Sequence, residues 1–302
     1  MAKNYKHEIP YDDGWEKLEG PLPVKLTNDY LFRALLQADE ETLKALVADL
    51  LHIRVSEVTE IEIINPIELG ETIDDKEFHL DINAMLNDSV NVNLEIQVLH
   101  EVNWVERSML YAFRRFDSLS HGEDYMDAEG VIQISFTDFT LFEDVPEFYS
   151  TFKLINEKNH SQVYSEKIRI SNVNLKRIDL ATDEDRFYRI DRWAKMFKAE
   201  SWEEIKMLAE KQPEIKKAAS SIWQFTEEEK IREQIRRRTA NEHMYQRTMN
   251  KLKEQEKELA ETRMELNAAK EEVIAAQDLL NEKEKSIREL ENQLKAIKAD
   301  VE

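Results

Sequence analysis

Three polar residues on two neighbouring segments, Asp81, Glu95 and Gln97, have the types and spacing that could carry out chemistry. They lie in residues 76–100, KEFHLDINAMLNDSVNVNLEIQVLH, where apolar residues occupy the even positions from Phe78 to Leu86 and again from Val90 to Val98. Alternation with a period of two predicts two β-strands that bury their even faces. The polar odd faces then carry Asp81 on the first strand and both Glu95 and Gln97 on the second.

The loop between these strands decides which residues face each other. A two-residue turn at Asn87-Asp88 would place apolar residues opposite polar ones, so such a hairpin could not bury one face. A three-residue loop over 87–89 pairs residues whose numbers sum to 176, which brings Asp81 opposite Glu95. Directly opposed residues have Cβ atoms roughly 4.5–5.5 Å apart. Two carboxylates at that separation repel each other unless a cation lies between them.

Two interpretations of this acidic pair follow from the residues. With 63 acidic side chains in the chain, the pair could simply belong to a polar face that points into water. Alternatively, two carboxylates form the hard oxygen site that suits Mg²⁺ or Mn²⁺, whose shell is completed by water and substrate phosphate. That second interpretation predicts phosphoryl transfer or phosphodiester hydrolysis.

The surrounding sequence predicts the elements that would position these residues. A helix is expected over 27–51, capped at Thr27-Asn28-Asp29 and interrupted near Asp39, and a strand over 58–64. A helix over 103–121 and a strand over 131–137 should follow. The helix over 103–121 has large apolar residues at helical spacing that we expect in the core: Trp104, Met109, Leu110, Phe113, Phe116 and Leu119. Aromatic residues in 183–224 predict helices around a second small core.

Composition excludes several classes of protein. The chain has 302 residues with 41% hydrophobic residues, enough for a sizeable core, and no cysteine, which excludes a disulfide framework or a thiolate zinc site. Its formal charge of −21 excludes a generic basic coat for nucleic acid. No stretch approaches the ~20 apolar residues of a membrane span, so we expect a soluble, cytoplasmic protein.

The last third of the chain predicts a long helix, because all glycines and prolines fall before residue 214. From Leu252 onward an aliphatic residue recurs every seventh position: Leu252, Leu259, Leu266, Val273, Leu280, Ile287, Leu294 and Val301. Such a repeat predicts a coiled coil, with a homodimer favoured. Residues 1–224 carry 26 basic and 44 acidic side chains, a net of −18, so most of the acidity precedes this helix.

Several segments together resemble the PD-(D/E)XK nuclease family transposases, the Rpn-type recombination-promoting nucleases or putative transposases. They are TNDYLFRALL at 27–36, HLDINAML and VNLEIQVLH within 79–100, ERSMLYAFRRFDSLSHGEDY at 106–125 and VIQISFTDFTLF at 131–142. A weaker likeness continues to about residue 225. The resemblance implies an α/β, restriction-endonuclease-like fold, a mixed central sheet flanked by helices.

The residue patterns and the resemblance together predict a division of the chain. An irregular segment over 1–24 would precede a nuclease-like domain over 25–180. A helical extension packed on that domain, over 181–225, would lead into the long helix and coiled coil over 226–302.

Carried over residue by residue, the resemblance assigns roles to three positions. Asp81 and Glu95 would hold Mg²⁺ or Mn²⁺, and Gln97 stands where the general pattern has lysine. A neutral amide can orient water or phosphate but cannot offset negative charge. Asp29 is a possible additional acid of the site, although helix capping explains it equally well.

The resemblance makes DNA the expected partner and a metal-dependent endonuclease the expected activity. Arg107, Arg114 and Arg115 are candidate contacts to DNA phosphates, or ordinary surface charges. The biological role would be recombination, mobile-element movement or defence against foreign DNA. The competing hypothesis is a catalytically degenerate nuclease fold that acts as a scaffold through its coiled coil, which the net charge of the front part favours.

Overall fold

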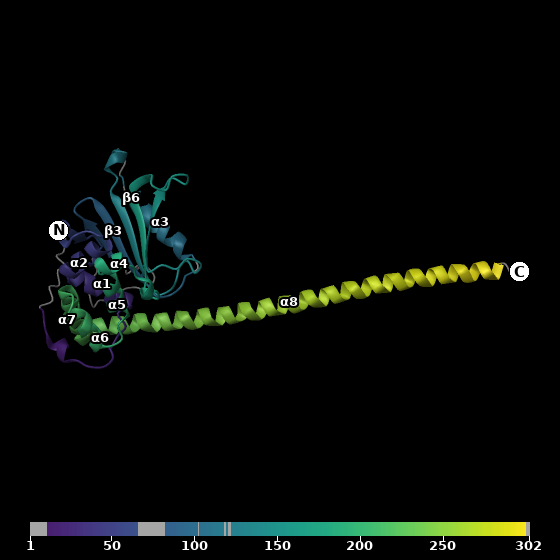
Figure 1. The fold of residues 1–302 in the computed structure, drawn as a ribbon. Helices are drawn as coiled ribbons and strands as arrows, with labels where there is room; N and C mark the ends of the chain where they lie inside the picture. The colour runs from purple at the N-terminus through teal and green to yellow at the C-terminus, as the bar shows by residue number, and fades with distance from the viewer. Residues whose placement is uncertain (1–10, 66–81, 102, 118, 120–121, 300–302) are drawn as a thin grey trace. The chain divides into compact units, whose positions relative to one another are not determined.

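The computed structural model describes residues 11–65, 82–101, 103–117, 119 and 122–299, with side chains as far as residue 291. Its centre is a six-stranded mixed sheet in the order β1-β2-β3-β4-β6-β5 (Figure 1). The strands are β1 (Ile61–Ile63), β2 (Ile82–Leu86), β3 (Val90–Gln97), β4 (Gly130–Thr137), β5 (Tyr149–Ile155) and β6 (Val163–Asn174). This sheet with flanking helices confirms the predicted fold class.

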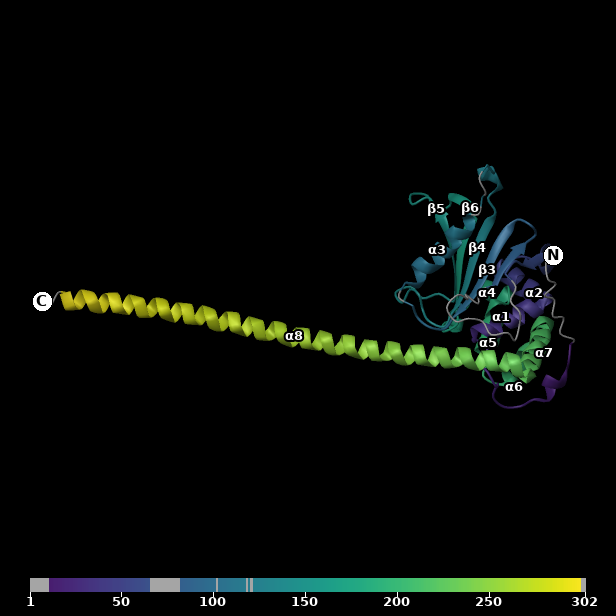
Figure 2. The same ribbon diagram turned by 180° about the vertical axis from the view of Figure 1, so that it is seen from behind.

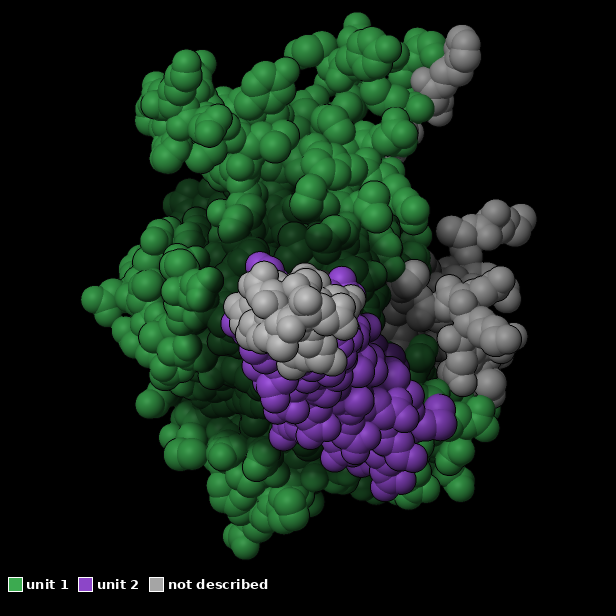
Figure 3. Space-filling view, turned by 90° about the vertical axis from the view of Figure 1, so that its right-hand side faces the viewer, with its two compact units in different colours: residues 1–242 green, residues 243–302 purple. Residues whose placement is uncertain are grey.

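The helices follow the strands in an order close to the predicted one. They are α1 (Asp29–Ala38), α2 (Glu40–Leu50), α3 (Trp104–Phe116), α4 (Asp183–Phe187), α5 (Ile190–Lys198), α6 (Trp202–Ala209), α7 (Pro213–Glu227) and α8 (Glu229–Ala299). Short 3₁₀ turns cover Gly14–Lys17, Val55–Glu57, Tyr125–Asp127 and Ile178–Leu180. The chain divides into two compact units, residues 1–242 and 243–302 (Figure 3).

The β2–β3 hairpin has the predicted register. Leu86 pairs with Val90, Ala84 with Val92 and Ile82 with Leu94, so each pair of numbers sums to 176. The loop over 87–89 turns through left-handed backbone at Asn87 and Asp88, with φ of 48° and 52°. Asn and Asp tolerate this region better than other non-glycine residues do. The predicted three-residue loop is therefore confirmed.

Strands β3, β4 and β6 form the parallel centre of the sheet. Because parallel strands end at the same edge, the carboxyl ends of these three strands lie side by side. Glu95 is level with Ser135 of β4, and Ser135 is level with Asn172 of β6. The β6 strand and its antiparallel partner β5 were not among the predicted elements.

One face of the sheet packs against helices that come from both ends of the globular unit. Phe32 of α1 contacts both Phe136 of β4 and Phe197 of α5, with ring centroids 5.7 and 5.2 Å apart. In Figures 1 and 2, α1 and α5 lie on the same side of the sheet, opposite α3. The buried Trp193 and Phe225 belong to this same core. The prediction of a second, separate core in 183–224 is therefore wrong.

Helix α3 covers the opposite face of the sheet through one large side chain, that of the predicted core residue Trp104, and two small ones. Its buried residues are Trp104, Ser108 and Ala112, which recur every fourth position. The predicted core residues Met109, Leu110 and Phe113 are instead 42%, 53% and 40% exposed, so that part of the prediction is wrong. The physical reason is that Ser108 and Ala112 let the helix backbone lie close to the sheet, which turns the larger residues outward. The helix also ends at Phe116, earlier than predicted.

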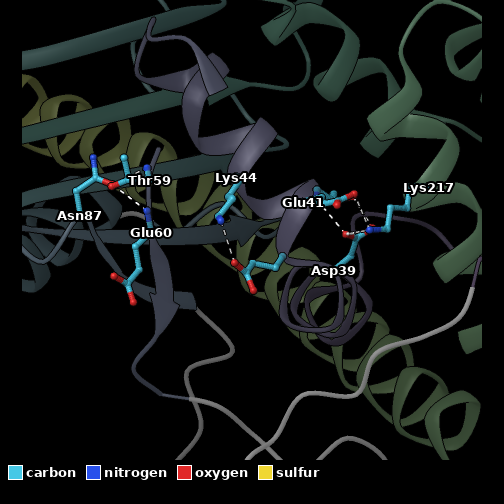
Figure 4. A network of polar contacts seen from close by, with 9 residues as sticks. Asp39, Glu41, Lys44, Thr59, Glu60, Asn87 and Lys217 are labelled. Atoms are coloured by element: carbon cyan, nitrogen blue, oxygen red, sulfur yellow. Dashed lines mark hydrogen bonds and ion pairs between the residues drawn. The ribbon is translucent and has the colours of Figure 1, made fainter. Parts of the chain in front are cut away.

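Asp39 separates α1 from α2, which confirms the predicted interruption of the first helix. Its Oδ1 accepts a hydrogen bond from the backbone N–H of Thr42 at 3.1 Å, which caps α2. Lys217 of α7 forms ion pairs with Asp39 and Glu41 at 3.3 and 2.8 Å (Figure 4). These contacts tie the junction of α1 and α2 to α7.

Helix α8 confirms the predicted long C-terminal helix. Its first turns belong to the globular unit, where Ile231 and Ile235 are each 1% exposed. The heptad residues with described side chains are all exposed, from Leu252 at 46% to Val273 at 67%. Within the described parts of the chain, every helix is too short or too polar to cross a membrane.

Candidate functional site at the carboxyl ends of the parallel strands

The sheet face under α3 changes from apolar to polar along the strands. At the amino ends, Val131 and Ile168 pack against Ala112 of α3. Nearer the carboxyl ends, the amide of Asn93 donates a hydrogen bond to Gln133 at 2.8 Å, and Glu95 follows two residues later. These polar residues are buried rather than solvated, with Asn93 0% and Glu95 7% exposed. The interpretation of a polar face pointing into water is therefore wrong for the described residues.

Glu95 is held by Arg107, from the first turns of α3. The Nη2 atom of Arg107 lies 2.9 Å from Oε1 of Glu95, and its Nη1 atom lies 2.8 Å from Oε2 of Glu101. Burial alone would lower the pKa of the Arg107 guanidinium, but Glu95, Glu101 and Tyr111 raise this pKa above its ordinary value. Arg107 thus carries a permanent positive charge between two carboxylates.

Gln97 joins the same network at the end of β3. Its Nε2 atom donates hydrogen bonds to the carbonyl of Leu99 at 2.9 Å and to Glu101 at 3.4 Å. With the amide nitrogen used in this way, the amide oxygen is the end that can accept a hydrogen bond from water. The structure therefore brings the predicted residues Glu95, Gln97 and Arg107 together around Glu101.

Further polar side chains line the same edge of the sheet on β4 and β6. Ser135 lies beside Glu95 and is 2% exposed, and its hydroxyl has no hydrogen-bond partner within the described parts of the chain. Thr137 lies beside Gln97, and its hydroxyl reaches the carbonyl of Phe139 at 3.0 Å and Oδ1 of Asn172 at 3.1 Å. Among the described residues, the Thr137 hydroxyl therefore has two partners and the Ser135 hydroxyl has none.

Asp29 is the first residue of α1, and its Oδ1 accepts a hydrogen bond from the backbone N–H of Tyr30 at 2.7 Å. The N-cap residue itself is Asn28, whose Oδ1 accepts a hydrogen bond from the backbone N–H of Leu31 at 3.1 Å. Burial raises the pKa of Asp29, although nearby Arg238 of α8 lowers it. Burial and the charge of Asp29 also raise the pKa of Glu242 to about 7. The structure thus gives Asp29 charged neighbours on α8.

Asp81 lies outside the described residues. The described register ends with the pair Ile82 and Leu94, so the next predicted pair, Asp81 with Glu95, stays a prediction. Arg114 and Arg115 lie in the last turn of α3, about two turns beyond Arg107. Arg114 is exposed and Arg115 is half-buried, so each has some accessible surface.

The donors of the site agree in kind with a divalent metal ion. Glu95 and Gln97 lie on the same face of β3, two residues apart, and both offer oxygen atoms, the ligands that Mg²⁺ prefers. Across the described ranges, however, no group of three or more acidic or histidine side chains is arranged to hold a metal. Glu95 is thus one candidate ligand, and the predicted second carboxylate is Asp81.

The sequence reasoning missed Glu101, Tyr111, Ser135, Thr137 and Asn172 as members of this site. A signal existed for two of them, because Ser135 and Thr137 are polar alternating residues of the predicted strand 131–137. Nothing local points to Asn172, whose strand was not predicted. The contact between Arg107 and Glu95 depends on how α3 lies over the sheet, which local patterns do not specify.

Comparison with known proteins agrees with this architecture. A family model described as PD-(D/E)XK nuclease family transposase matches residues 26–251, which is most of the chain. Searches of curated proteins and of solved structures found no match. Nucleases of the PD-(D/E)XK type use divalent metal ions and act on DNA, so the match indicates a nuclease-like function. On the strength of the match and the mixed sheet, the chain belongs to the PD-(D/E)XK nuclease family transposases.

Proposed function

We propose that this protein is a metal-dependent DNA endonuclease that hydrolyses phosphodiester bonds. The observation that supports the proposal most directly is the buried Glu95 on β3, 7% exposed and followed two residues later by Gln97. A buried charge destabilises a fold unless it is well paired, and Arg107 pairs with Glu95 here, which keeps a charged oxygen ligand at the carboxyl end of β3.

In this proposal, Glu95 and Asp81 hold Mg²⁺ or Mn²⁺. The metal, when bound, lowers the pKa of a water molecule and stabilises negative charge on the phosphate. Gln97 orients water or the scissile phosphate through its amide, because a neutral amide can form hydrogen bonds without contributing charge. Asp29 is a possible further acid of the site, and the exposed Arg114 and the half-buried Arg115 are possible contacts to DNA phosphates.

The test is nicking of supercoiled plasmid with Mg²⁺ or Mn²⁺ by the full chain and two variants. Asp81→Ala and Glu95→Ala should each abolish metal-dependent nicking while far-UV circular dichroism stays unchanged. A matched control is Asp183→Ala, at an exposed acid of α4 whose side chain is accessible over its whole surface. Cleavage at the wild-type rate by both site variants would contradict the proposal.

We propose that the protein acts as a homodimer joined through the coiled coil of α8. The exposed heptad residues from Leu252 to Ile287 form an apolar seam along α8, which a partner helix would cover. Two nuclease domains held together suit cutting of both DNA strands, because each site cleaves one strand. Sedimentation equilibrium of the full chain should give a dimer, and the triple variant Leu259→Gln, Leu266→Gln, Leu280→Gln should give a monomer.

We propose that this activity serves recombination, mobile-element movement or defence against foreign DNA, and that the protein acts in the cytoplasm.

A second candidate function is a scaffold that acts through α8 without catalysis. The net charge of −18 over residues 1–224 favours this alternative, because an acidic surface repels DNA. Titration calorimetry with Mn²⁺ separates the two. Binding that is lost in Asp81→Asn supports the endonuclease, whereas no binding by the wild-type chain supports the scaffold.

A further inference from the structure

We propose that Arg107 is a positioning residue of the candidate site. Its guanidinium holds the Glu95 carboxylate and supplies, from α3, the positive charge that the amide at position 97 lacks. The inference rests on the proposed endonuclease function and assigns Arg107 a different role from the DNA contact expected from the sequence. The side chain is 20% exposed, so it is mostly enclosed by the protein.

The guanidinium uses its nitrogen atoms to join three side chains. Nη2 donates to Glu95 at 2.9 Å, Nη1 donates to Glu101 at 2.8 Å, and Nε donates to the hydroxyl of Tyr111 at 3.2 Å. Only a planar fork of donors can make such contacts at once. Glu95 is therefore held in one orientation by a group that is itself held at several points.

Two aromatic rings reinforce that geometry. The Cζ atom of Arg107 lies 5.1 Å from the ring centroid of Trp104 and 5.4 Å from that of Tyr111. A cation over an aromatic face is attracted by the ring, and more strongly where water is excluded. Trp104 is 2% exposed and packs edge-on against Phe139, so the platform beneath the guanidinium is rigid.

The charge of the network explains what the guanidinium would do for the reaction. Gln97 carries no charge and donates to Glu101, whereas Arg107 brings a positive charge into direct contact with Glu95. Glu95, Glu101 and Arg107 together retain one negative charge, which still attracts a divalent cation. A fixed positive charge next to the reacting phosphate stabilises the negative charge that develops during hydrolysis.

This role predicts opposite effects on metal binding and on cleavage. The positive charge next to Glu95 opposes a metal ion electrostatically, so its removal should tighten metal binding. The same removal takes away charge stabilisation and the positioning of Glu95, so cleavage should slow. A merely structural role would weaken both properties together.

The experiment uses the full chain with Arg107→Gln and Arg107→Lys, and with Arg186→Gln as a control that makes the same change in charge. Arg186 forms an exposed ion pair with Asp183 in α4. Mn²⁺ affinity is measured by electron paramagnetic resonance, and plasmid nicking is measured with Mg²⁺. For Arg107→Gln we expect nicking to fall about 100-fold or more and the Mn²⁺ dissociation constant to fall about threefold or more. Arg107→Lys should recover part of the nicking, and Arg186→Gln should match the wild type.

Each outcome decides the inference. A folded Arg107→Gln variant that nicks at the wild-type rate overturns it and leaves the endonuclease proposal standing. Slower nicking with unchanged or weaker Mn²⁺ binding also overturns it, because that pattern indicates a structural role. If Arg107→Gln fails to fold, a folded Arg107→Lys decides: nicking about tenfold below wild type supports the inference, and the wild-type rate overturns it. A wild-type chain that neither binds Mn²⁺ nor nicks DNA removes the endonuclease proposal and this inference together.

Discussion

The Nη2 atom of Arg107 lies 2.9 Å from Oε1 of Glu95, and the two side chains are only 20% and 8% exposed. A buried ion pair is weak evidence for stability, because the desolvation of both charges opposes their attraction. Removal of a single partner is costly, however, since the other charge then stays buried without it. The pair therefore couples the candidate site to the stability of the fold.

This coupling can be measured with a double-mutant cycle. We expect Glu95→Gln and Arg107→Gln each to lower the free energy of unfolding by about 1–3 kcal/mol. The double variant should lose less than the sum, with a coupling of about 1 kcal/mol or more. Urea unfolding followed by circular dichroism measures all of these values, and additive single effects would contradict the contact.

Asp49 provides a second test of buried charge, away from the candidate site. Its Oδ1 lies 2.6 Å from Nη2 of Arg189, and its Oδ2 accepts a hydrogen bond from Nε1 of Trp193 at 2.8 Å. These contacts join α2 to the start of α5. Asp49→Ala should lower the free energy of unfolding by about 2–4 kcal/mol. The control Asp183→Ala, in an exposed pair, should change that free energy by less than about 0.5 kcal/mol.

The acidic groups where α1 meets the start of α8 predict a pH dependence of stability. Burial and Asp29 raise the pKa of Glu242 from 4.5 to about 7. Between these values the folded state binds a proton that the unfolded state has released, so stability falls as pH rises. The burial that raises the pKa of Asp29 acts in the same direction. The wild-type chain should therefore be more stable near pH 5 than near pH 8.

Glu242→Gln should remove much of this pH dependence. At pH 8 the variant should be about 1–2 kcal/mol more stable than the wild type, after allowance for partial exposure of the carboxyl. At pH 5 the two proteins should be similar. Urea unfolding at both pH values checks the difference, with Glu233→Gln, an exposed acid on the same helix, as the control. Equal slopes of stability against pH in the wild type and Glu242→Gln would contradict the assignment.

The two buried hydroxyls beside the candidate site predict opposite responses to their removal. Ser135 has no hydrogen-bond partner within the described residues, so Ser135→Ala should leave stability unchanged or raise it by up to about 1 kcal/mol. Thr137 reaches both Phe139 and Asn172, so Thr137→Val should lower stability by about 1–2 kcal/mol. Thermal unfolding of both variants checks the contrast. A clear loss of stability in Ser135→Ala would show that this hydroxyl has a partner.

Local patterns predicted the β2–β3 hairpin correctly because the register of two strands can change only by whole residues. A shift by one residue would have moved every apolar side chain of the strands to the other face, so only one loop length agreed with a buried even face. The long helix was equally predictable, since residues 214–302 contain no glycine or proline. The interruption expected near Asp39 is also confirmed, and the structure shows that the Asp39 side chain caps α2.

Helix α3 shows where local patterns failed. Large apolar residues at helical spacing predicted a buried face with Met109, Leu110 and Phe113, yet the buried face contains Ser108 and Ala112. Which face of an amphipathic helix packs inward depends on how closely the partner surface can approach. The sequence does not describe that surface, and small side chains carry little signal in a hydrophobic pattern.

The sequence by itself determined the strand that carries Glu95 and Gln97 and its register with β2, because alternation and turn length act over a few residues, and its resemblance to a family gave the expectation of a nuclease fold. Only the tertiary structure decided what surrounds Glu95. Arg107 contacts it from helix α3. Ser135 lies beside it on β4, a parallel strand that a long crossover connects to β3. Such contacts between distant segments depend on packing of the whole unit, which no local spacing encodes.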